Sequence, residues 1–237
     1  MSWRFHKTPA TALAVAAVMF SATHALAQTA TVSPPAAQST VTNNSGTALP
    51  AYETTGFRSA HFGMTDGDVR AAIKADLGAS ADIKTATNSI ERTTLLSATV
   101  PSLDPGPGAA TVVYIFGYKS KKLIQVNIIW AGATAGGDAQ PYLVAGLQLA
   151  NYFKGFSWKD GKVVAGAPSG PNGIVMFAAE DEKNGLVQVT VEGLALEKQV
   201  EGKTELGPKP TTPLMLRLAY VADGRSPDVF HLEQGRF

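Results

Sequence analysis

Hydrophobic residues recur at every fourth position in one short stretch near the start of the folded part of the chain. At this spacing Val69, Ile73 and Leu77 lie on one side of an α-helix, with polar or small residues between them. Thr65 is a favourable N-terminal cap, with an aspartate three residues later to complete a capping box, and Gly78 is a favourable stop. The pattern predicts a helix from Thr65 to Gly78 that packs on the β-structure following it.

Alternation of apolar and polar residues then replaces the helical period. It predicts a strand at 93–100 and a β-hairpin of two strands, 111–118 and 123–130, joined by a polar turn. Residues 80–88, between the helix and the first strand, fit either a second short helix or a loop.

The second half of the chain repeats this order of a helix followed by strands. A helix is predicted at 138–155, with Leu143, Leu147 and Ala150 on its buried face. The later patterns predict a strand at 158–165, a second hairpin at 174–179 and 185–194, a charged loop at 197–213 and a last strand at 214–221.

Helices followed by runs of strands indicate an α+β fold with antiparallel sheets. The two hairpins also align without a gap at an offset of 63 residues, so that 123–128 falls on 186–191. Two interpretations stay open, an internal duplication or the alternation that any two strands share. We expect a disordered linker at 28–54, followed by two helix-plus-antiparallel-sheet units at 55–136 and 137–237.

The predicted core consists of the inward-facing apolar residues of these elements. An exported chain without cysteine has to draw its stability from such a core, because disulfides are not available. Its expected members are Val69, Ile73, Leu77, Tyr114, Phe116, Ile124, Val126, Ile128, Leu143, Leu147, Val187, Val189, Leu216 and Leu218.

Residues 1–27 have the pattern of a secretory signal peptide. Arg4 and Lys7 precede an apolar run at 10–22, and small residues before Gln28 mark a cleavage site. The apolar run is too short to span a bilayer comfortably. We therefore expect a periplasmic or secreted protein, cleaved after Ala27 and without a transmembrane span.

Charge and cysteine usage narrow the class of partner. The chain has 20 basic and 19 acidic residues, and loss of Arg4 and Lys7 with the leader leaves 18 basic residues and a net charge near −1. This balance argues against a nucleic-acid partner. The absence of cysteine excludes disulfides and a lipidated cysteine.

Residues suited to catalysis or metal binding are few. Removal of the leader leaves His61 and His231 of the four histidines, and neither has a cluster of acids close to it in the sequence. We therefore expect no metal site and no cofactor. A phosphate-binding loop and a serine-nucleophile motif are both missing at the required spacing. Acid–base catalysis stays open, because folding can bring distant carboxylates together.

Residues 62–78, in which Gly63-Met64-Thr65 precedes the helix of Val69 and Ile73, resemble the opening of BamE-like (SmpA/OmlA) envelope modules. Such modules are small exported domains with helices on one face of an antiparallel sheet, and tandem copies of a similar unit occur in the β-lactamase-inhibitor-protein fold. The resemblance implies a non-catalytic binding or scaffolding protein of the bacterial cell envelope with an envelope protein as its partner. The alternatives are a periplasmic hydrolase and a carrier of a small apolar ligand.

Opposite charges mark the two hairpin turns. Two solvated turns account for such a pattern, and so do complementary contact surfaces that steer a partner or a second copy. The tentative contact surface consists of Lys119, Lys121 and Lys122 in the first turn and Glu180, Asp181 and Glu182 at the matching place in the second.

The leader pattern generates one direct prediction about the exported protein. Mass spectrometry of the exported form should find Gln28 at its N-terminus, because cleavage after Ala27 removes the apolar run. A membrane-bound species that retains Met1 or Ser2 would contradict this expectation.

Overall fold

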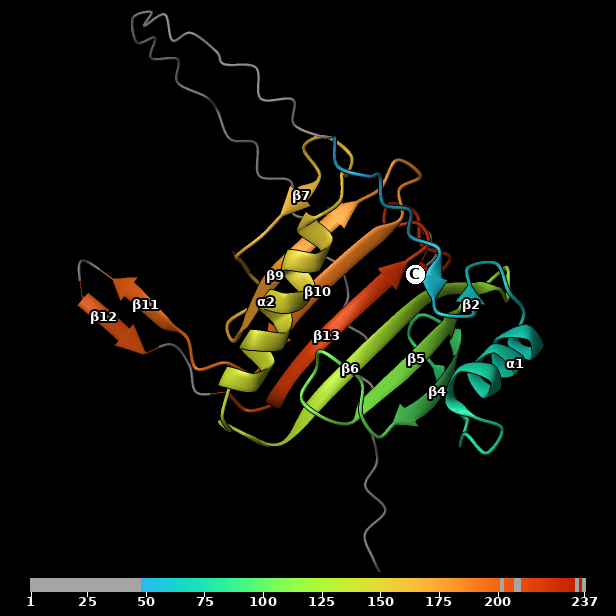
Figure 1. Ribbon diagram of the computed structural model, residues 1–237, viewed down its shortest axis with the longest axis horizontal. Helices are drawn as coiled ribbons and strands as arrows, with labels where there is room; N and C mark the ends of the chain where they lie inside the picture. Colours follow the sequence, from blue (N-terminus) through green and yellow to red (C-terminus); the bar gives the residue numbers. More distant parts are fainter. Residues whose placement is uncertain (1–47, 201–202, 207–209, 233–234, 236–237) are drawn as a thin grey trace, which may run out of the picture. The chain divides into compact units, whose positions relative to one another are not determined.

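Nine strands of the described chain form one antiparallel sheet (Figure 1). The structure is a computed structural model that describes residues 48–200, 203–206, 210–232 and 235. The strands lie in the order β3-β4-β5-β6-β13-β10-β9-β7, and β8 also pairs with β9. Their bounds are Lys84–Asn88 (β3), Thr93–Val100 (β4), Ala110–Phe116 (β5), Leu123–Ala135 (β6), Pro213–Val221 (β13), Leu186–Glu192 (β10), Gly173–Glu180 (β9), Val163–Val164 (β7) and Ala167–Pro168 (β8).

Two short ribbons and two helices complete the α+β fold that the sequence predicts. One ribbon pairs β1 (Gly56–Phe57) with β2 (Ala60–His61), and the other pairs β11 (Glu197–Val200) with β12 (Lys203–Leu206). Neither α1 (Asp66–Leu77) nor α2 (Gln140–Lys154), the helices of the described residues, is long and apolar enough to cross a membrane.

Helix α1 begins and ends where the sequence predicts. Thr65 is its N-cap, and a capping box forms because the Asp68 amide donates to Thr65 Oγ1 at 3.3 Å while the Thr65 amide donates to Asp68 Oδ2 at 3.0 Å. Gly78 ends the helix with a positive φ of 97°. Val69 and Ile73 are fully buried, which confirms the predicted stripe.

Helix α2 lies within the predicted range 138–155, and its predicted buried face is confirmed in part, because Ala150 is buried and Leu143 packs against the core. Ala145, Leu149 and Phe153 point into the core, whereas Leu147 is 51% exposed and its predicted place in the core is wrong. The neighbouring Gly146 lets the helix approach the sheet closely, since a Cβ there would lie 3.2 Å from Val191. Close packing of small residues therefore decides which side of α2 faces inward.

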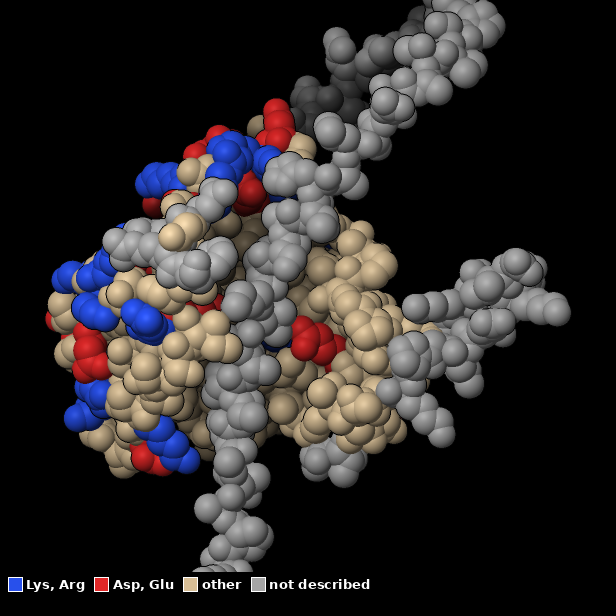
Figure 2. Space-filling view, turned by 180° about the vertical axis from the view of Figure 1, so that it is seen from behind, with Lys and Arg blue, Asp and Glu red and all other residues tan. Residues whose placement is uncertain are grey.

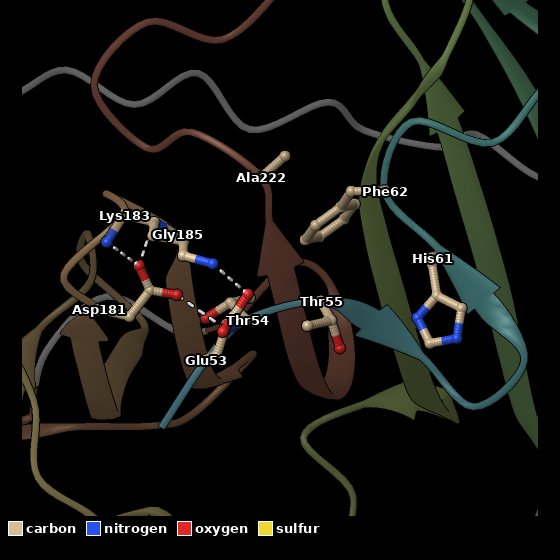
Figure 3. Close-up of a pocket in the computed structure, with 9 residues that line it drawn as sticks. All are labelled: Glu53, Thr54, Thr55, His61, Phe62, Asp181, Lys183, Gly185 and Ala222. Atoms are coloured by element: carbon tan, nitrogen blue, oxygen red, sulfur yellow. Dashed lines mark hydrogen bonds and ion pairs between the residues drawn. The ribbon is translucent and has the colours of Figure 1, made fainter. Parts of the chain in front are cut away.

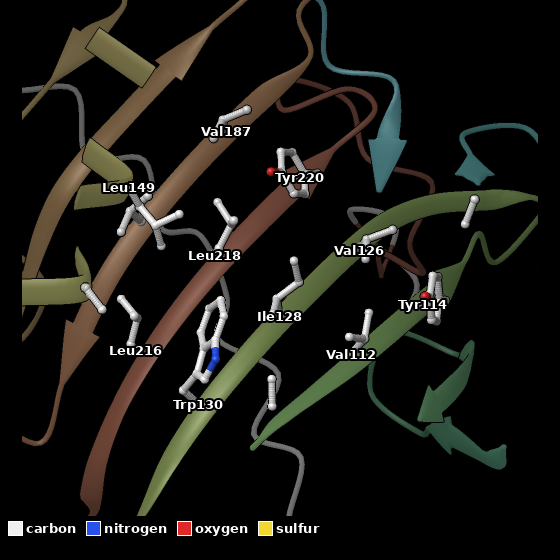
Figure 4. Packing of buried hydrophobic residues seen from close by; sticks show 14 of the residues in the cluster. Val112, Tyr114, Val126, Ile128, Trp130, Leu149, Val187, Leu216, Leu218 and Tyr220 are labelled. Carbon is white, nitrogen blue, oxygen red and sulfur yellow. The ribbon is translucent and has the colours of Figure 1, made fainter. Parts of the chain in front are cut away.

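Both helices contribute to one continuous core on the same face of the sheet. Figure 4 shows the part of this core that lies over β5, β6, β13 and β10. Most of the predicted core residues belong to it, and its largest fully buried side chains include Trp130, Tyr114 and Phe116. Leu77 and Leu143 pack against it while remaining partly exposed. The interior between helices and sheet is thus filled by side chains of the predicted hairpins and of α2.

Ile124 lies on the opposite face of the sheet from the one predicted. It packs with a second cluster that contains Leu95, Val113 and Ile115. The cause is a β-bulge, because Ile115 pairs with Gln125 while the next residue of β5 pairs with Leu123. One extra residue reverses the alternation of side chains, so Leu123 enters the main core in place of Ile124.

Three segments differ from the sequence-based expectation in secondary structure. Residues 84–88 form the edge strand β3 where a helix or a loop was expected. The predicted loop at 197–213 contains the β11–β12 ribbon, and the predicted strand at 158–165 is reduced to the two residues of β7. These elements are short or polar, so tertiary context outweighs their weak local pattern.

The strand order relates the two halves of the chain differently from the 63-residue alignment. That alignment equates β6 with β10, which run in the same direction on either side of β13, while β5 and β9 lie outside them on opposite sides. Such hairpins are mirror images within the plane of the sheet, so no rotation superposes them with their core faces together. Counted inward from either edge of the sheet, the strands occur in equivalent order when β6 is equated with β13 and β5 with β10.

A matched pair of substitutions on α2 tests its buried face. Leu149→Ala should lower the free energy of unfolding by about 2–5 kcal/mol, because it opens a cavity in the core. Leu147→Ala should change it by less than about 0.5 kcal/mol, because that side chain is exposed. Urea denaturation of the mature chain measures both, and a reversed order of the two effects would show that the helix is rotated.

Candidate functional site

The two charged turns lie at the same end of the sheet. Val221 at the end of β13 pairs with Gln125 near the start of β6, and it also pairs with Leu186 at the start of β10. The turn at 117–122, called the lysine turn, and the turn at 180–185, called the acidic turn, therefore lie at this end. The structure thus brings together two predicted sets of charges that are about sixty residues apart in the sequence.

Two further segments cross this end of the sheet. These segments and the two turns are together called the rim. Residues 50–64, the strap, begin at the end of α2, where the Tyr52 amide donates to the Ser157 carbonyl at 3.2 Å. They end at β6, where the amide of Gly63 donates to the Leu123 carbonyl at 2.9 Å. The ordered strap thus starts before the boundary expected at residue 55. Residues 222–232, the C-terminal segment, follow β13.

Asp181 is a buried structural acceptor in the acidic turn. Its side chain is 2% exposed and accepts hydrogen bonds at 2.8 Å from the amides of Thr54, Lys183 and Gly185. One of these donors belongs to the strap, so the carboxylate joins the strap to the turn. The sequence places Asp181 on a contact surface, whereas the structure places it beneath that surface.

The other acids of the turn differ in their surroundings. Glu180 accepts from the guanidinium of Arg225 at 2.8 Å, so the C-terminal segment holds its charge. Lys183 forms an ion pair of 2.7 Å with Glu53 of the strap. Glu182 is exposed at the tip of the turn.

The lysine turn presents three exposed ammonium groups. Lys119, Lys121 and Lys122 are all exposed, and Lys121 Nζ lies 5.3 Å from the centroid of the Tyr118 ring. Seen from behind, charged side chains crowd the rim and the side of the molecule that carries α1, while the opposite side is largely uncharged (Figure 2). The lysine turn thus adds three positive charges to the rim.

A shallow hollow of about 440 Å³ opens between the acidic turn and the strap (Figure 3). Asp181 and Lys183 line one side of it, and His61 and Phe62 lie across from them. The Thr54 hydroxyl beside it is buried and has no hydrogen-bond partner in the described chain. The remaining lining residues are Glu53, Thr55, Gly185 and Ala222.

The polar groups of the hollow do not assemble an acid–base pair. Asp181 is engaged by three amides, and Glu53 by Lys183. The His61 ring makes no hydrogen bond or ion pair with a carboxylate in the part of the chain that the structure describes. Within those residues no group of three or more potential metal ligands is found either.

The raised tyrosine pKa values belong to the core. Burial raises the pKa of Tyr52 to about 12 and also raises the pKa of Tyr114 and of Tyr220. Tyr52 stacks on Trp158 with a centroid distance of 4.7 Å. These shifts reflect close aromatic packing under the rim and in the core.

At the surface, local hydrogen bonds shift the pKa values of a few charged groups. The hydrogen bond with the Thr65 side chain lowers the pKa of Asp68, and the hydrogen bond with Glu53 raises the pKa of Lys183. Desolvation alone raises the pKa of Asp228, but hydrogen bonds from Ser120 and Lys119 outweigh it and lower that pKa. All three shifts arise from helix capping and from contacts that fix the rim.

Sequence reasoning missed the residues that organise the rim from a distance. Asp228 and Arg225 each bond to a turn, and Phe230 packs on Tyr118 with a centroid distance of 5.5 Å. The sequence does indicate that the tail docks, because Phe230, Leu232 and Phe237 are apolar. Phe230 does dock, whereas Leu232 is exposed and Phe237 lies outside the described residues.

A matched pair of substitutions separates the two roles within the acidic turn. Asp181→Ala should lower the free energy of unfolding by about 2–4 kcal/mol, because it leaves three amides without their acceptor. It should also speed hydrogen exchange at the Thr54 amide. Glu182→Ala should change stability by less than about 0.5 kcal/mol. Thermal melts and amide exchange of both variants provide the measurement, and equal effects would contradict the assignment.

The chain was also compared with known proteins. Comparison with protein-family models, with curated proteins and with solved structures gives no match in any of the three. The function is therefore argued from the rim itself.

Proposed function

We propose that the chain is an exported, non-catalytic binding or scaffolding protein of the bacterial cell envelope, and that the rim is its contact surface. The observation that carries the proposal is the meeting of the two charged turns at one end of the sheet. Strap and C-terminal segment hold these turns in place, while the three lysine side chains extend into solvent. Such a preorganised charged surface suits the steering and orientation of a protein partner.

Two observations favour binding over the alternative activities. Hydrolysis needs a positioned acid or base. The acids beside the hollow already accept hydrogen bonds from amides or form an ion pair with a lysine. Carriage of an apolar ligand needs space between helices and sheet, and that region is filled by large side chains such as Trp130, Tyr114 and Phe153.

Export to the periplasm is part of the same proposal. It rests on the signal-peptide pattern of residues 1–27, which lie outside the described residues, and on the resemblance of 62–78 to envelope modules. An envelope protein is accordingly the proposed partner.

The proposal includes an origin from two related helix-plus-sheet units. The order of elements supports it, since α1-β3-β4-β5-β6 and α2-β7-β9-β10-β13 each run from a helix through antiparallel strands toward the centre of the sheet. The two central strands, β6 and β13, are then related by a twofold axis perpendicular to the sheet. A Cα superposition in which these strands fail to coincide when the helices do would contradict the common origin.

Affinity capture from envelope extract with the immobilised mature protein tests the proposed function. A variant with Lys119→Glu, Lys121→Glu and Lys122→Glu should associate with the captured partner at least several-fold more slowly at low salt. Its melting temperature should stay nearly unchanged, because exposed ion pairs contribute only about 0–1 kcal/mol each. The difference in rate should shrink at high salt, where the charges are screened.

A charge-matched control makes this test specific. Lys74, Lys84 and Lys154 are exposed on α1, β3 and α2, away from the lysine turn, and the same reversal there alters the net charge equally. The control should retain the association rate of the wild type to within about twofold. Equal slowing by both variants would mean that net charge, and not the rim, governs the encounter.

A further inference from the structure

Asp228 of the C-terminal segment is bound by three consecutive backbone amides of the lysine turn. The Tyr118 amide donates to its carbonyl oxygen at 2.7 Å, and those of Lys119 and Ser120 donate to its carboxylate oxygens at 2.9 and 2.7 Å. The Lys119 and Ser120 amides converge on one carboxylate, and amides arranged in this way form a concave site for an anionic group. Gly117 keeps the site open, because a Cβ there would overlap the Asp228 carboxylate.

Phe230 occupies a second position two residues further on. Its ring packs edge-on against Tyr118, and the Arg92 guanidinium carbon lies 3.7 Å from the ring centroid. Its amide donates to the Glu91 carbonyl at 2.9 Å. The aromatic ring and the backbone are therefore both recognised, the ring partly through a cation–π contact.

Together these contacts make a site for a short extended peptide. The carboxylate enters the cluster of amides, the aromatic ring lies between Tyr118 and Arg92, and backbone hydrogen bonds fix the register. Recognition of extended segments by backbone bonds and separate side-chain positions is a common binding mode. Here the chain's own sequence Asp-Val-Phe fills the site.

The charges around this site select the class of ligand. Lys119, Lys121, Lys122 and Arg92 lie on the two turns that form it, and all four are exposed. A cationic surrounding attracts an acidic segment and speeds its encounter. An acidic residue followed two positions later by an aromatic one is the pattern that this site fits.

We propose that the lysine turn and the turn at 89–92 form a docking site for an extended acidic–x–aromatic segment of a partner protein, and that residues 228–230 occupy this site as an internal competitor. This inference rests on the proposed function and names the chemistry of its partner. A segment in the same chain competes at an effective concentration on the order of millimolar. A partner segment must therefore bind more tightly than the internal one, or arrive attached to a second contact.

The opposing possibility is that the C-terminal segment is a permanent part of the fold. The two readings differ in what happens when a peptide of the same sequence is added. A permanent element is not displaced from the wild type by added peptide, whereas a competitor gives way once the peptide concentration approaches the effective concentration of the internal segment.

Binding of a labelled peptide to the mature full-length chain distinguishes these readings. The probe is a fluorescein-labelled peptide with the sequence of residues 226–232, followed by anisotropy. A variant with Asp228→Ala and Phe230→Ala, the opened variant, should bind it at least tenfold more tightly than the wild type. The affinity should fall between 50 and 200 mM salt.

Two controls tie the signal to this site. A peptide with alanine in place of its acidic and aromatic residues should bind at least tenfold more weakly to the opened variant. Adding Arg92→Ala to the opened variant should weaken binding of the original peptide several-fold. In ¹⁵N NMR spectra, the Lys119 and Ser120 amide signals of the opened variant should return toward their wild-type positions when peptide is added.

Several results would overturn the proposal. Equal peptide binding by wild type and opened variant would do so, and so would equal binding of the control peptide. Should the opened variant unfold, Asp228→Asn alone is tested by the same NMR titration, and unchanged Lys119 and Ser120 signals would count against the site. A wild-type dimer that the peptide dissociates would instead assign the site to a second copy.

The outcome for the proposed function is read separately. An envelope protein captured equally by wild type and opened variant, together with no peptide binding, would leave the proposed function standing and remove this inference. Capture that is stronger with the opened variant and is blocked by the peptide supports both.

Discussion

The pairing of β6 with β13 is the contact on which the rest of the molecule depends. These strands come from opposite halves of the chain, and their ladder runs from Ala135 opposite Pro213 to Gln125 opposite Val221. It joins two sets of antiparallel strands into one sheet, so both helices can cover the same face and share one core. The chain has no cysteine, so this junction is held by backbone hydrogen bonds and packing alone. The same register places both charged turns at one end.

Local patterns predicted the elements well where one sequence period dominates. The ends of α1 follow from Thr65 and Gly78, and the two hairpins follow from their alternation. The buried face of α2 was predicted only in part, because the helix has no charged residue before Lys154 and its leucines at 143, 147 and 149 spread over more than one side. The small residues Ala145 and Gly146, which allow the close approach, were the usable signal.

The bulge at Ile124 and the strand order could not be predicted from the sequence, for a different reason. Each depends on which strands become neighbours. Two strands with the same alternation give no sequence signal of which strand each will pair with. The candidate site likewise combines features that the local sequence reveals with features that depend on distant contacts. The charges of both turns are visible locally, but the bond from Thr54 to Asp181 spans 127 positions, and that from Lys119 to Asp228 spans 109. Only the folded structure shows that Asp181 stabilises the acidic turn from inside and that Asp228 accepts hydrogen bonds from amides of the lysine turn.

The outer edge beyond β9 has a consequence for how the sheet avoids pairing with other chains. Unpaired strand edges invite other chains to add to a sheet, and natural sheets often blunt them with very short strands. Here β7 and β8, two residues each, pair with different parts of β9 and are separated by a bend at Ala165 and Gly166. A foreign strand would find no straight row of free amides along them. The interrupted edge thus protects the sheet from pairing edge to edge with the sheet of another chain.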